Sequence, residues 1–262
     1  MKYYVISDPH GYLTYMSNAL RAAGFFDEKE PCKLIVCGDL LDRGYEAREI
    51  TEFMLKLLKE DKLIYILGNH EDLLVDCLQQ IARGGVFEIA CGMSHHYSNG
   101  TWDTLLQLGE MTENEVIANP NELIRRVRAS DFYKKLLSAG VDYFETENHI
   151  FVHGWIPCRI EVENFIERRR YDPEWREAGR EGWRRARWLN GMDMACKEGI
   201  REDGKTVVCG HWHASYGHFK FEGHGSEWGE EADFSPFYAE GIAAIDACTA
   251  GSQIVNCIVI ED

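Results

Sequence analysis

The chain has 262 residues, enough to bury a substantial core, and this length allows one large domain or two small ones. It carries 28 Lys and Arg against 44 Asp and Glu, a net charge of -16 at pH 7. This charge repels nucleic acid and anionic membrane surfaces, so we expect neither as a partner, whereas metal cations are attracted. The nine cysteines form no Cys-x-x-Cys pair, which favours reduced thiols in a cytoplasmic protein. Apolar runs are too short for a signal-peptide core or a membrane span, so the sequence predicts a soluble, non-secreted protein.

Short apolar runs rich in β-branched residues predict strands along the chain. The first three runs, at 3–6, 34–37 and 63–67, alternate with amphipathic helical patterns over 13–20 and 50–58. Strands that alternate with helices predict an α/β fold in which helices cover a sheet. Further strands are predicted at 150–152, 207–209, 242–245 and 254–260.

Three segments between these strands have their own character. The stretch at about 73–137 has no strand signal and predicts a helical insertion that caps the sheet. A second insertion, at about 159–201, is dense in arginine and tryptophan and is expected to be irregular, and 217–240 is a loop rich in glycine, aromatic and acidic residues. No repeat or low-complexity linker divides the chain, so we expect residues 1–262 to form a single domain.

Five polar clusters directly follow predicted strands, which places them together at the carboxyl ends of the strands. They offer carboxylates, imidazoles and one amide, a donor set that suits Mn, Fe or Zn better than Ca or Mg. No cysteine joins them, as a purely structural zinc would favour. Each cluster alone is commonly a turn or a helix start, but five in order predict one site. In chain order they are Asp8-Pro9-His10-Gly11, Gly38-Asp39-Leu40-Leu41-Asp42-Arg43-Gly44, Gly68-Asn69-His70-Glu71, His153-Gly154 and Gly210-His211-Trp212-His213.

Together these clusters resemble the five signature motifs of the calcineurin-like metallophosphoesterases, in particular the bacterial and phage branch of the phosphoprotein phosphatases. That branch reads Gly-Asp-x-His-Gly, Gly-Asp-x-x-Asp-Arg-Gly, Gly-Asn-His-Glu, His-Gly and Gly-His. The match spans residues 7–213, with Ser7 in place of the first glycine. The resemblance implies four layers, in which two mixed sheets lie between helices and two metal ions lie at one edge.

The resemblance also implies a set of metal ligands. Asp8 and His10 would bind the first metal, and Asp39 would bridge both. The second metal would be bound by Asn69, His153 and His211. We expect two divalent ions, with Mn favoured and Fe or Zn as alternatives. The wider superfamily often reads Gly-His-x-His, so His213 would be a seventh ligand, unless it is merely a solvated imidazole.

The same resemblance assigns the chemistry. His70 would protonate the leaving group while Asp42 orients it, and Arg43 would grip the phosphate oxygens beside Asn69. The branch has a second arginine in a Trp-x-Arg pattern. Here Trp188-Leu189-Asn190 puts Asn190 at that place, which leaves Arg187 as the candidate for the second phosphate contact, with Arg184 and Arg185 as further substitutes.

These features predict a phosphoesterase hydrolase, with phosphoserine or phosphothreonine in proteins as its first substrate. The rival enzyme is a hydrolase of dinucleoside polyphosphates such as diadenosine tetraphosphate, or of another small phosphoester. A nuclease would need a basic track that the acidic charge does not favour. A catalytically silent module that binds metal or senses phosphate is the alternative without turnover. Asp246 is expected to anchor a turn without a catalytic role.

Overall fold

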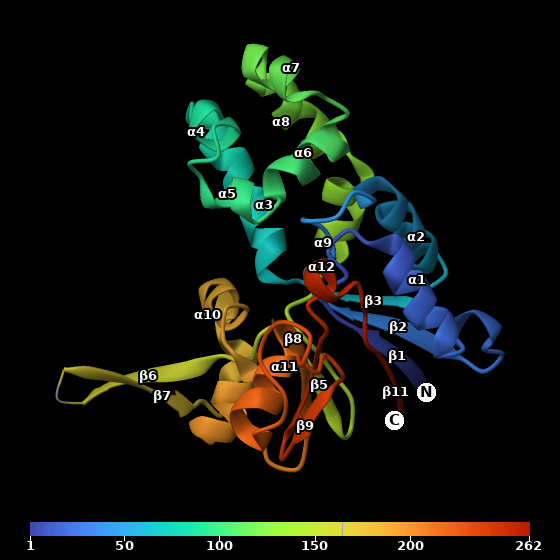
Figure 1. Ribbon diagram of the computed structural model, residues 1–262, viewed down its shortest axis with the longest axis vertical. Helices are drawn as coiled ribbons and strands as arrows, with labels where there is room; N and C mark the ends of the chain where they lie inside the picture. The colour runs from blue at the N-terminus through green and yellow to red at the C-terminus, as the bar shows by residue number, and fades with distance from the viewer. Residues whose placement is uncertain (164) are drawn as a thin grey trace.

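A computed structural model describes residues 1–163 and 165–262 of the chain. Its strands build two mixed sheets (Figure 1). In the first sheet β1, β2 and β3 run parallel, and β11 pairs antiparallel with β1. In the second sheet β5, β8 and β10 run parallel, while β4 and β9 pair antiparallel at the two edges. The strand order is β11 (Cys257–Glu261), β1 (Lys2–Ile6), β2 (Cys32–Cys37) and β3 (Leu63–Ile66) in the first sheet, and β4 (Phe144–Glu145), β5 (His149–Phe151), β8 (Thr206–His213), β10 (Ile242–Asp246) and β9 (Phe237–Ala239) in the second.

Alternation along the strands divides the core into layers. In β1, Tyr3 and Val5 belong to the cluster between the sheets, together with Val208 of β8. Tyr4 and Ile6 point the other way, into the cluster that contains helices α1 (Leu13–Ala22) and α2 (Ala47–Lys59). The outer face of the second sheet packs under a group of tryptophans near α10 (Gly179–Ala186). The predicted layers of two mixed sheets flanked by helices are therefore confirmed.

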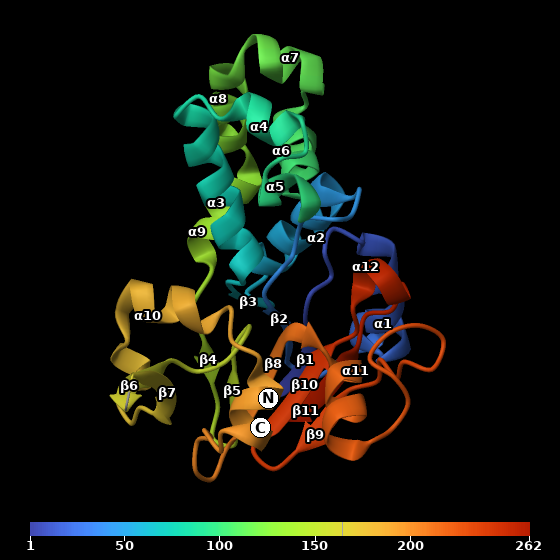
Figure 2. The same cartoon turned by 60° about the vertical axis from the view of Figure 1, so that its left-hand side comes forward.

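The segment between β3 and β4 is helical, and we call residues 69–139 the helical lobe. The lobe starts at the end of β3 and extends away from both sheets to one end of the molecule (Figures 1 and 2). Its Trp102 and Leu105 nevertheless share one apolar cluster with Leu34 of the first sheet, so the lobe is continuous with the main core. Its helices are α3 (Asn69–Ala82), α4 (Val86–Ala90), α5 (His95–Ser98), α6 (Thr101–Gly109), α7 (Glu113–Ala118), α8 (Pro120–Ala129), η2 (Phe132–Leu136) and α9 (Leu137–Ala139).

The second insertion is more regular than its sequence suggested. Strands β6 (Cys158–Glu163) and β7 (Ile166–Tyr171) form an antiparallel hairpin that projects from the body (Figure 1). The prediction of an irregular segment was wrong: residues 159–163 alternate charged and apolar side chains, as strands do, but Ile160 and Val162 are exposed and no buried apolar run marks the hairpin. The insertion continues through η3 (Trp175–Glu177), α10 and η4 (Asp193–Lys197).

The remaining short elements lie mostly in the C-terminal part of the chain. The expected 217–240 loop contains the end of α11 (Ala214–Gly217), then η5 (His218–Glu222) and β9. The other two elements are η1 (Phe25–Asp27) and α12 (Thr249–Ser252). Within the ranges that the structure describes, every helix is too short or too polar to cross a membrane.

Candidate metal centre and active site

The loops that carry the motifs have unusual backbone conformations. Non-glycine residues with positive φ cost about 1–3 kcal/mol each and persist where the surroundings hold them in place. Backbone strain of this kind concentrates at functional sites. Six motif residues have this conformation: Asp8 (φ 51), His10 (φ 47), Asp39 (φ 52), Asp42 (φ 72), Arg43 (φ 65) and His211 (φ 65).

Two motif glycines are required because the backbone passes very close to a candidate ligand. A Cβ at Gly68 would lie 2.2 Å from Asp39 Oδ1, and one at Gly210 would lie 2.0 Å from Asp8 Oδ2. Both distances are far below van der Waals contact, so any side chain at these positions would push the carboxylates out of place. The glycines therefore fix the positions of the two acids.

The structure brings two groups of candidate ligands together around one carboxylate. His10, Asp39 and His70 form the first group, and Asp39, His153 and His211 form the second, with the ligand atoms of each group within 4.8 Å of one another. Asp39 Oδ2 faces the first group, 3.8 Å from His10 Nε2, whereas Oδ1 faces the second, 3.3 Å from His153 Nε2. A carboxylate with one oxygen toward each group fits a bridge between two metal ions.

Asn69 and Asp8 border these groups. The side-chain oxygen of Asn69 lies 2.7 Å from His153 Nε2, at the second group. Asp8 lies outside both groups, and its Oδ2 accepts the backbone N–H of His211 at 3.0 Å. Burial and the neighbouring carboxylate of Asp246 raise the pKa of Asp8 well above its usual range.

Asp246 anchors a turn, as its sequence context suggested, because its Oδ1 accepts the backbone N–H of Cys248 at 2.7 Å. Burial raises its pKa to about 6. Its electrostatic effect on Asp8 was not foreseen.

The charge states around Asp39 are those that metal binding requires. Burial lowers the pKa values of His10, His153 and His211, the last to about 3, so their imidazoles are neutral near pH 7. Burial alone would raise the pKa of Asp39, but positive charge on the surrounding imidazoles, His153 first and His70 next, lowers it below its ordinary value, and His70 is the one of them whose own pKa is raised. Neutral imidazoles and an ionised carboxylate are the ligating forms. The donor set therefore fits a pair of divalent metal ions.

Backbone carbonyl groups orient two of the imidazoles. His10 Nδ1 lies 3.0 Å from the carbonyl oxygen of Leu41, and His153 Nδ1 lies 2.8 Å from that of Cys37. A carbonyl only accepts, so each Nδ1 carries the proton and the Nε2 of each neutral ring has the lone pair that a metal would bind. The end of β2 and the loop that follows it thus fix the tautomers of both residues.

His70, a member of the first group, forms a buried pair with Asp42, which lies outside that group. His70 Nδ1 lies 2.7 Å from Asp42 Oδ2. Burial lowers the pKa of His70, but Asp39 and the hydrogen bond to Asp42 outweigh it and raise the pKa above its ordinary value. The pair therefore has the arrangement of an acid with an orienting carboxylate, and the catalytic roles of both residues stay a prediction.

Arg43 lies across the first group. Its Nη1 is 2.9 Å from His10 Nε2 and its Nη2 is 3.2 Å from His70 Nε2. A guanidinium only donates, so both Nε2 atoms are acceptors in this arrangement. A metal at His10 Nε2, or a proton on His70 Nε2, therefore requires the Arg43 side chain to move, and a phosphate dianion would attract it.

Glu71 is a site residue to which sequence reasoning gave no role. Its buried carboxylate accepts the backbone N–H groups of Gly68 at 2.6 Å, Asp39 at 3.1 Å and Leu40 at 3.1 Å. Burial and the Asp39 charge raise its pKa to about 7. Glu71 therefore ties two motif loops together. It was visible in the Gly-Asn-His-Glu motif, but its backbone partners were not.

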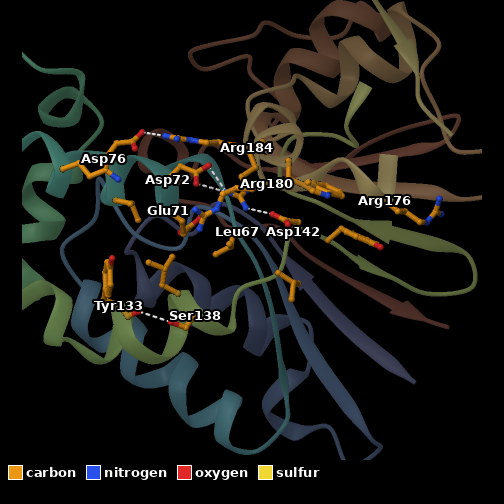
Figure 3. A pocket seen from close by; sticks show the side chains of 18 of the residues that line it. Leu67, Glu71, Asp72, Asp76, Tyr133, Ser138, Asp142, Arg176, Arg180 and Arg184 are labelled. Atoms are coloured by element: carbon orange, nitrogen blue, oxygen red, sulfur yellow. Dashed lines mark hydrogen bonds and ion pairs between the residues drawn. The ribbon is translucent and has the colours of Figure 1, made fainter. Parts of the chain in front are cut away.

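A cavity of about 1090 Å³ is lined by residues of α3 and α10, and Figure 3 shows Asp72 and Asp142 on its wall. Arg187 also lines this cavity. Its Nη1 contacts both Asp72 oxygens, at 2.7 and 2.8 Å, and its Nη2 contacts Asp142 at 2.5 Å. Arg184 pairs with Asp76 on the same cavity wall. These ion pairs hold Arg187 on carboxylates, and its contact with a phosphate stays a prediction.

Two further residues were singled out in the sequence, His213 as a possible seventh metal ligand and Asn190 at the place of the second arginine. His213 Nε2 lies 3.2 Å from Glu227, and its ring packs against Trp228 at 4.1 Å, outside both ligand groups, so its role as a seventh ligand stays a prediction. Asn190, which replaces the second arginine, accepts the backbone N–H groups of Met192 and Asp193 at 3.0 and 3.2 Å. Its side chain therefore caps the turn that leads into η4.

The chain belongs to the calcineurin-like phosphoesterase family, whose sequence profile matches residues 1–233. It is therefore a phosphoester hydrolase, in a family that typically depends on two metal ions. The resemblance seen in the motifs is confirmed. The finer assignments of substrate and of individual ligands are taken up below as proposals.

Solved structures with similar folds are distant in sequence. A cold-active protein-tyrosine phosphatase of the psychrophile Shewanella sp. has 13% identity and a TM-score of 0.51, over 100% of this chain and 75% of its own. A 1.1 Å structure of a cold-active protein tyrosine phosphatase has 14% identity and a TM-score of 0.51, over 99% and 73%. A protein described provisionally as a diadenosine tetraphosphatase has 15% identity and a TM-score of 0.49, over 99% and 89%. No curated protein matches the sequence significantly. At such low identities the likeness concerns the fold alone.

Proposed function

We propose that this chain is a dinuclear-metal phosphomonoesterase that uses His70 as its general acid and acts on phosphoserine and phosphothreonine in proteins. The observation that carries the proposal is the buried contact of 2.7 Å between His70 and Asp42, beside a carboxylate shared by two ligand groups. An acid held next to two candidate metal positions is the arrangement that ester hydrolysis requires.

The two ions would be held by Asp8, His10, Asp39, Asn69, His153 and His211, with Mn expected and Fe or Zn as alternatives. When bound, two such ions neutralise phosphate charge and lower the pKa of the attacking water. The histidine tautomers and the ionised Asp39 described above support this set. His213 would join it only if its imidazole left Glu227.

The reaction needs three actions from side chains of this chain. Arg43 turns from the two imidazoles to the nonbridging phosphate oxygens, beside the Asn69 amide. Water attacks phosphorus as the bond to the ester oxygen breaks, and one proton of that water leaves to solvent. His70 gives its Nε2 proton to the departing oxygen while Asp42 holds Nδ1, so phosphate and an alcohol are released.

The presence of a general acid, His70, favours an alkyl phosphate ester as the substrate. A serine or threonine alkoxide is a strong base and needs a proton to leave, whereas a phenolate or a nucleotide phosphate leaves more easily without one. A histidine whose pKa is raised by Asp39 and Asp42, against the effect of burial, is suited to supply that proton. This argument favours protein phosphoserine or phosphothreonine.

One observation favours the rival substrate, a dinucleoside polyphosphate. The exposed ring of Trp188 lies edge-on to His211, with 5.8 Å between the ring centroids. An exposed indole next to a candidate metal ligand would give a nucleobase a face on which to stack. Arg187 would then contact a distal phosphate after release from Asp72 and Asp142.

The test is Mn-dependent phosphate release from a phosphothreonine peptide, a phosphotyrosine peptide and diadenosine tetraphosphate, each with wild type and His70→Asn. We expect the phosphothreonine peptide to be preferred. The variant should lose about 100- to 10,000-fold on it and much less on the aryl ester. A preference for the dinucleotide would select the rival. No turnover with two metals bound would favour the silent module.

The pH dependence follows from the sign of the His70 shift. The acid form is present below the raised pKa of His70 and is lost as the pH rises through it. The kcat for the phosphothreonine peptide should therefore fall on the alkaline side, at a pH above the ordinary histidine value. The His70→Asn variant should lack this alkaline fall, and a fall that remains in the variant would assign it to another group.

A further inference from the structure

One face of helix α6 in the helical lobe contacts the loop that carries Asp42 and Arg43. Thr101 Oγ1 lies 2.7 Å from Asp42 Oδ2, and the Asp42 backbone N–H donates to Thr104 Oγ1 at 3.0 Å. Gln107 donates to the carbonyl oxygen of Gly44 at 3.0 Å and accepts the N–H of Ala47 at 3.1 Å. Residues spaced by three along a helix share a face, so one side of α6 holds the whole loop.

The backbone approach at this contact is close. A Cβ on Gly100, which precedes α6 and has φ +80, would lie 2.3 Å from the backbone nitrogen of Arg43. Thr101 and Thr104 are both fully buried. A buried hydroxyl with a carboxylate or backbone partner is costly to leave unpaired, so this contact has little freedom to slide.

The Asp42 carboxylate depends on few contacts. Its Oδ2 accepts from both His70 and Thr101, while its Oδ1 is buried and has no partner in the described part of the chain. Without the Thr101 hydroxyl, His70 would be the one remaining hydrogen-bond donor to this carboxylate among those residues. The orientation of His70 therefore depends on a side chain from the lobe.

We infer that Thr101 is a positioning residue for the general acid, and that helix α6 completes the active site through it. The inference rests on the proposed function, because it assumes that His70 protonates the leaving group. Thr101 does not touch substrate. It holds Asp42 in the rotamer that presents His70 Nε2 to the departing oxygen, so its loss should lower kcat rather than raise KM.

The test is Thr101→Val, which keeps the shape of the side chain and removes its donor. Phosphate release is measured with a phosphothreonine peptide and with p-nitrophenyl phosphate, whose phenolate leaves without a proton. We expect kcat on the peptide to fall about 10- to 100-fold, and several-fold less on the aryl ester. Because both substrates are measured on one preparation, the ratio of the two kcat values is independent of the fraction that is folded.

Three further variants show whether a change in that ratio comes from the Thr101 hydroxyl and acts through His70. Thr101→Ser keeps the donor and should restore most of the peptide activity. Thr51→Val removes another buried threonine hydroxyl, bonded at 2.6 Å to the Ala47 carbonyl oxygen in α2, and should leave the ratio unchanged. A ratio in Thr101→Val equal to that of wild type would overturn the inference. His70→Asn in parallel separates the two claims: if it also leaves the ratio unchanged, the proposed acid itself is wrong.

Discussion

The two sides of Asp39 are held in place by different parts of the molecule. On one side, His70 pairs with Asp42, and α6 of the helical lobe holds that carboxylate through Thr101. On the other side, His153 takes its orientation from the carbonyl oxygen of Cys37 at the end of β2, and the backbone N–H of His211 donates to the Asp8 carboxylate. The orientation of the acid thus depends on helix α6, whereas His153 and His211 are held by the sheets and the loops that follow their strands. Changes on the face of α6 that contacts Asp42 should therefore affect proton transfer with little effect on the affinity of the second metal.

The largest expected effect comes from removing the group that the two sides share. Asp39→Asn takes away one charged oxygen from a side chain that faces both ligand groups. Loss of a residue that only hydrogen-bonds to a metal ligand typically lowers metal affinity or activity about 10- to 100-fold. Loss of the shared ligand itself should therefore lower Mn-dependent activity by at least about 100-fold. The metal content, measured by mass spectrometry after Mn loading, should fall below two per chain.

The matched control is Asp61→Asn, which changes an exposed aspartate that also has positive φ and pairs with Lys33 at 2.8 Å. It should keep both metals and full activity. An Asp39→Asn protein that binds two ions as tightly as wild type would show that the carboxylate is not shared.

A smaller effect is expected at His213, which lies outside the second ligand group and contacts Glu227. His213→Asn removes the contact of 3.2 Å with Glu227. If that contact is its main role, thermal unfolding should show a loss of about 1 kcal/mol, and the Mn content should stay at two per chain. Glu227→Gln should give a similar loss of stability. A drop of one metal per chain in His213→Asn alone would instead make it the seventh ligand that the Gly-His-x-His pattern implies.

The site residues that could be predicted from the sequence are those that lie in a recognisable local pattern. Parallel strands end at the same edge of a sheet, so Asp39 and Asn69, which follow neighbouring strands of the first sheet, could be predicted to meet from the runs that precede them. His153 follows β5 of the second sheet, and its place beside them was implied by the resemblance of the motifs. The contact between Asp42 and Thr101 spans 59 residues and joins a loop to the first turn of a helix, where threonine has many ordinary uses. Nothing local to Thr101 marks its partner.

The strands likewise divide into those that a local sequence pattern indicates and those that it does not. The seven apolar runs predicted as strands all correspond to strands of the two sheets. Six of them are the parallel strands, which need continuous apolar residues because they are buried, and the seventh is the antiparallel edge strand β11. The β6–β7 hairpin was missed because both of its faces meet solvent and β7 carries a run of three arginines, although residues 159–163 alternate charged and apolar side chains as strands do. The two-residue strand β4 is too short to form any pattern.

The measurement that tests the central claim most directly is electron paramagnetic resonance of the protein loaded with two Mn²⁺ ions per chain. If Asp39 joins the two ligand groups, the ions lie roughly 3.5–4 Å apart, and their spins should couple into a broad exchange-coupled signal. Asp39→Asn should weaken or abolish this signal. A spectrum of isolated Mn²⁺ ions at full loading of the wild-type protein would contradict the account, because it would place the metals at separate, unconnected sites.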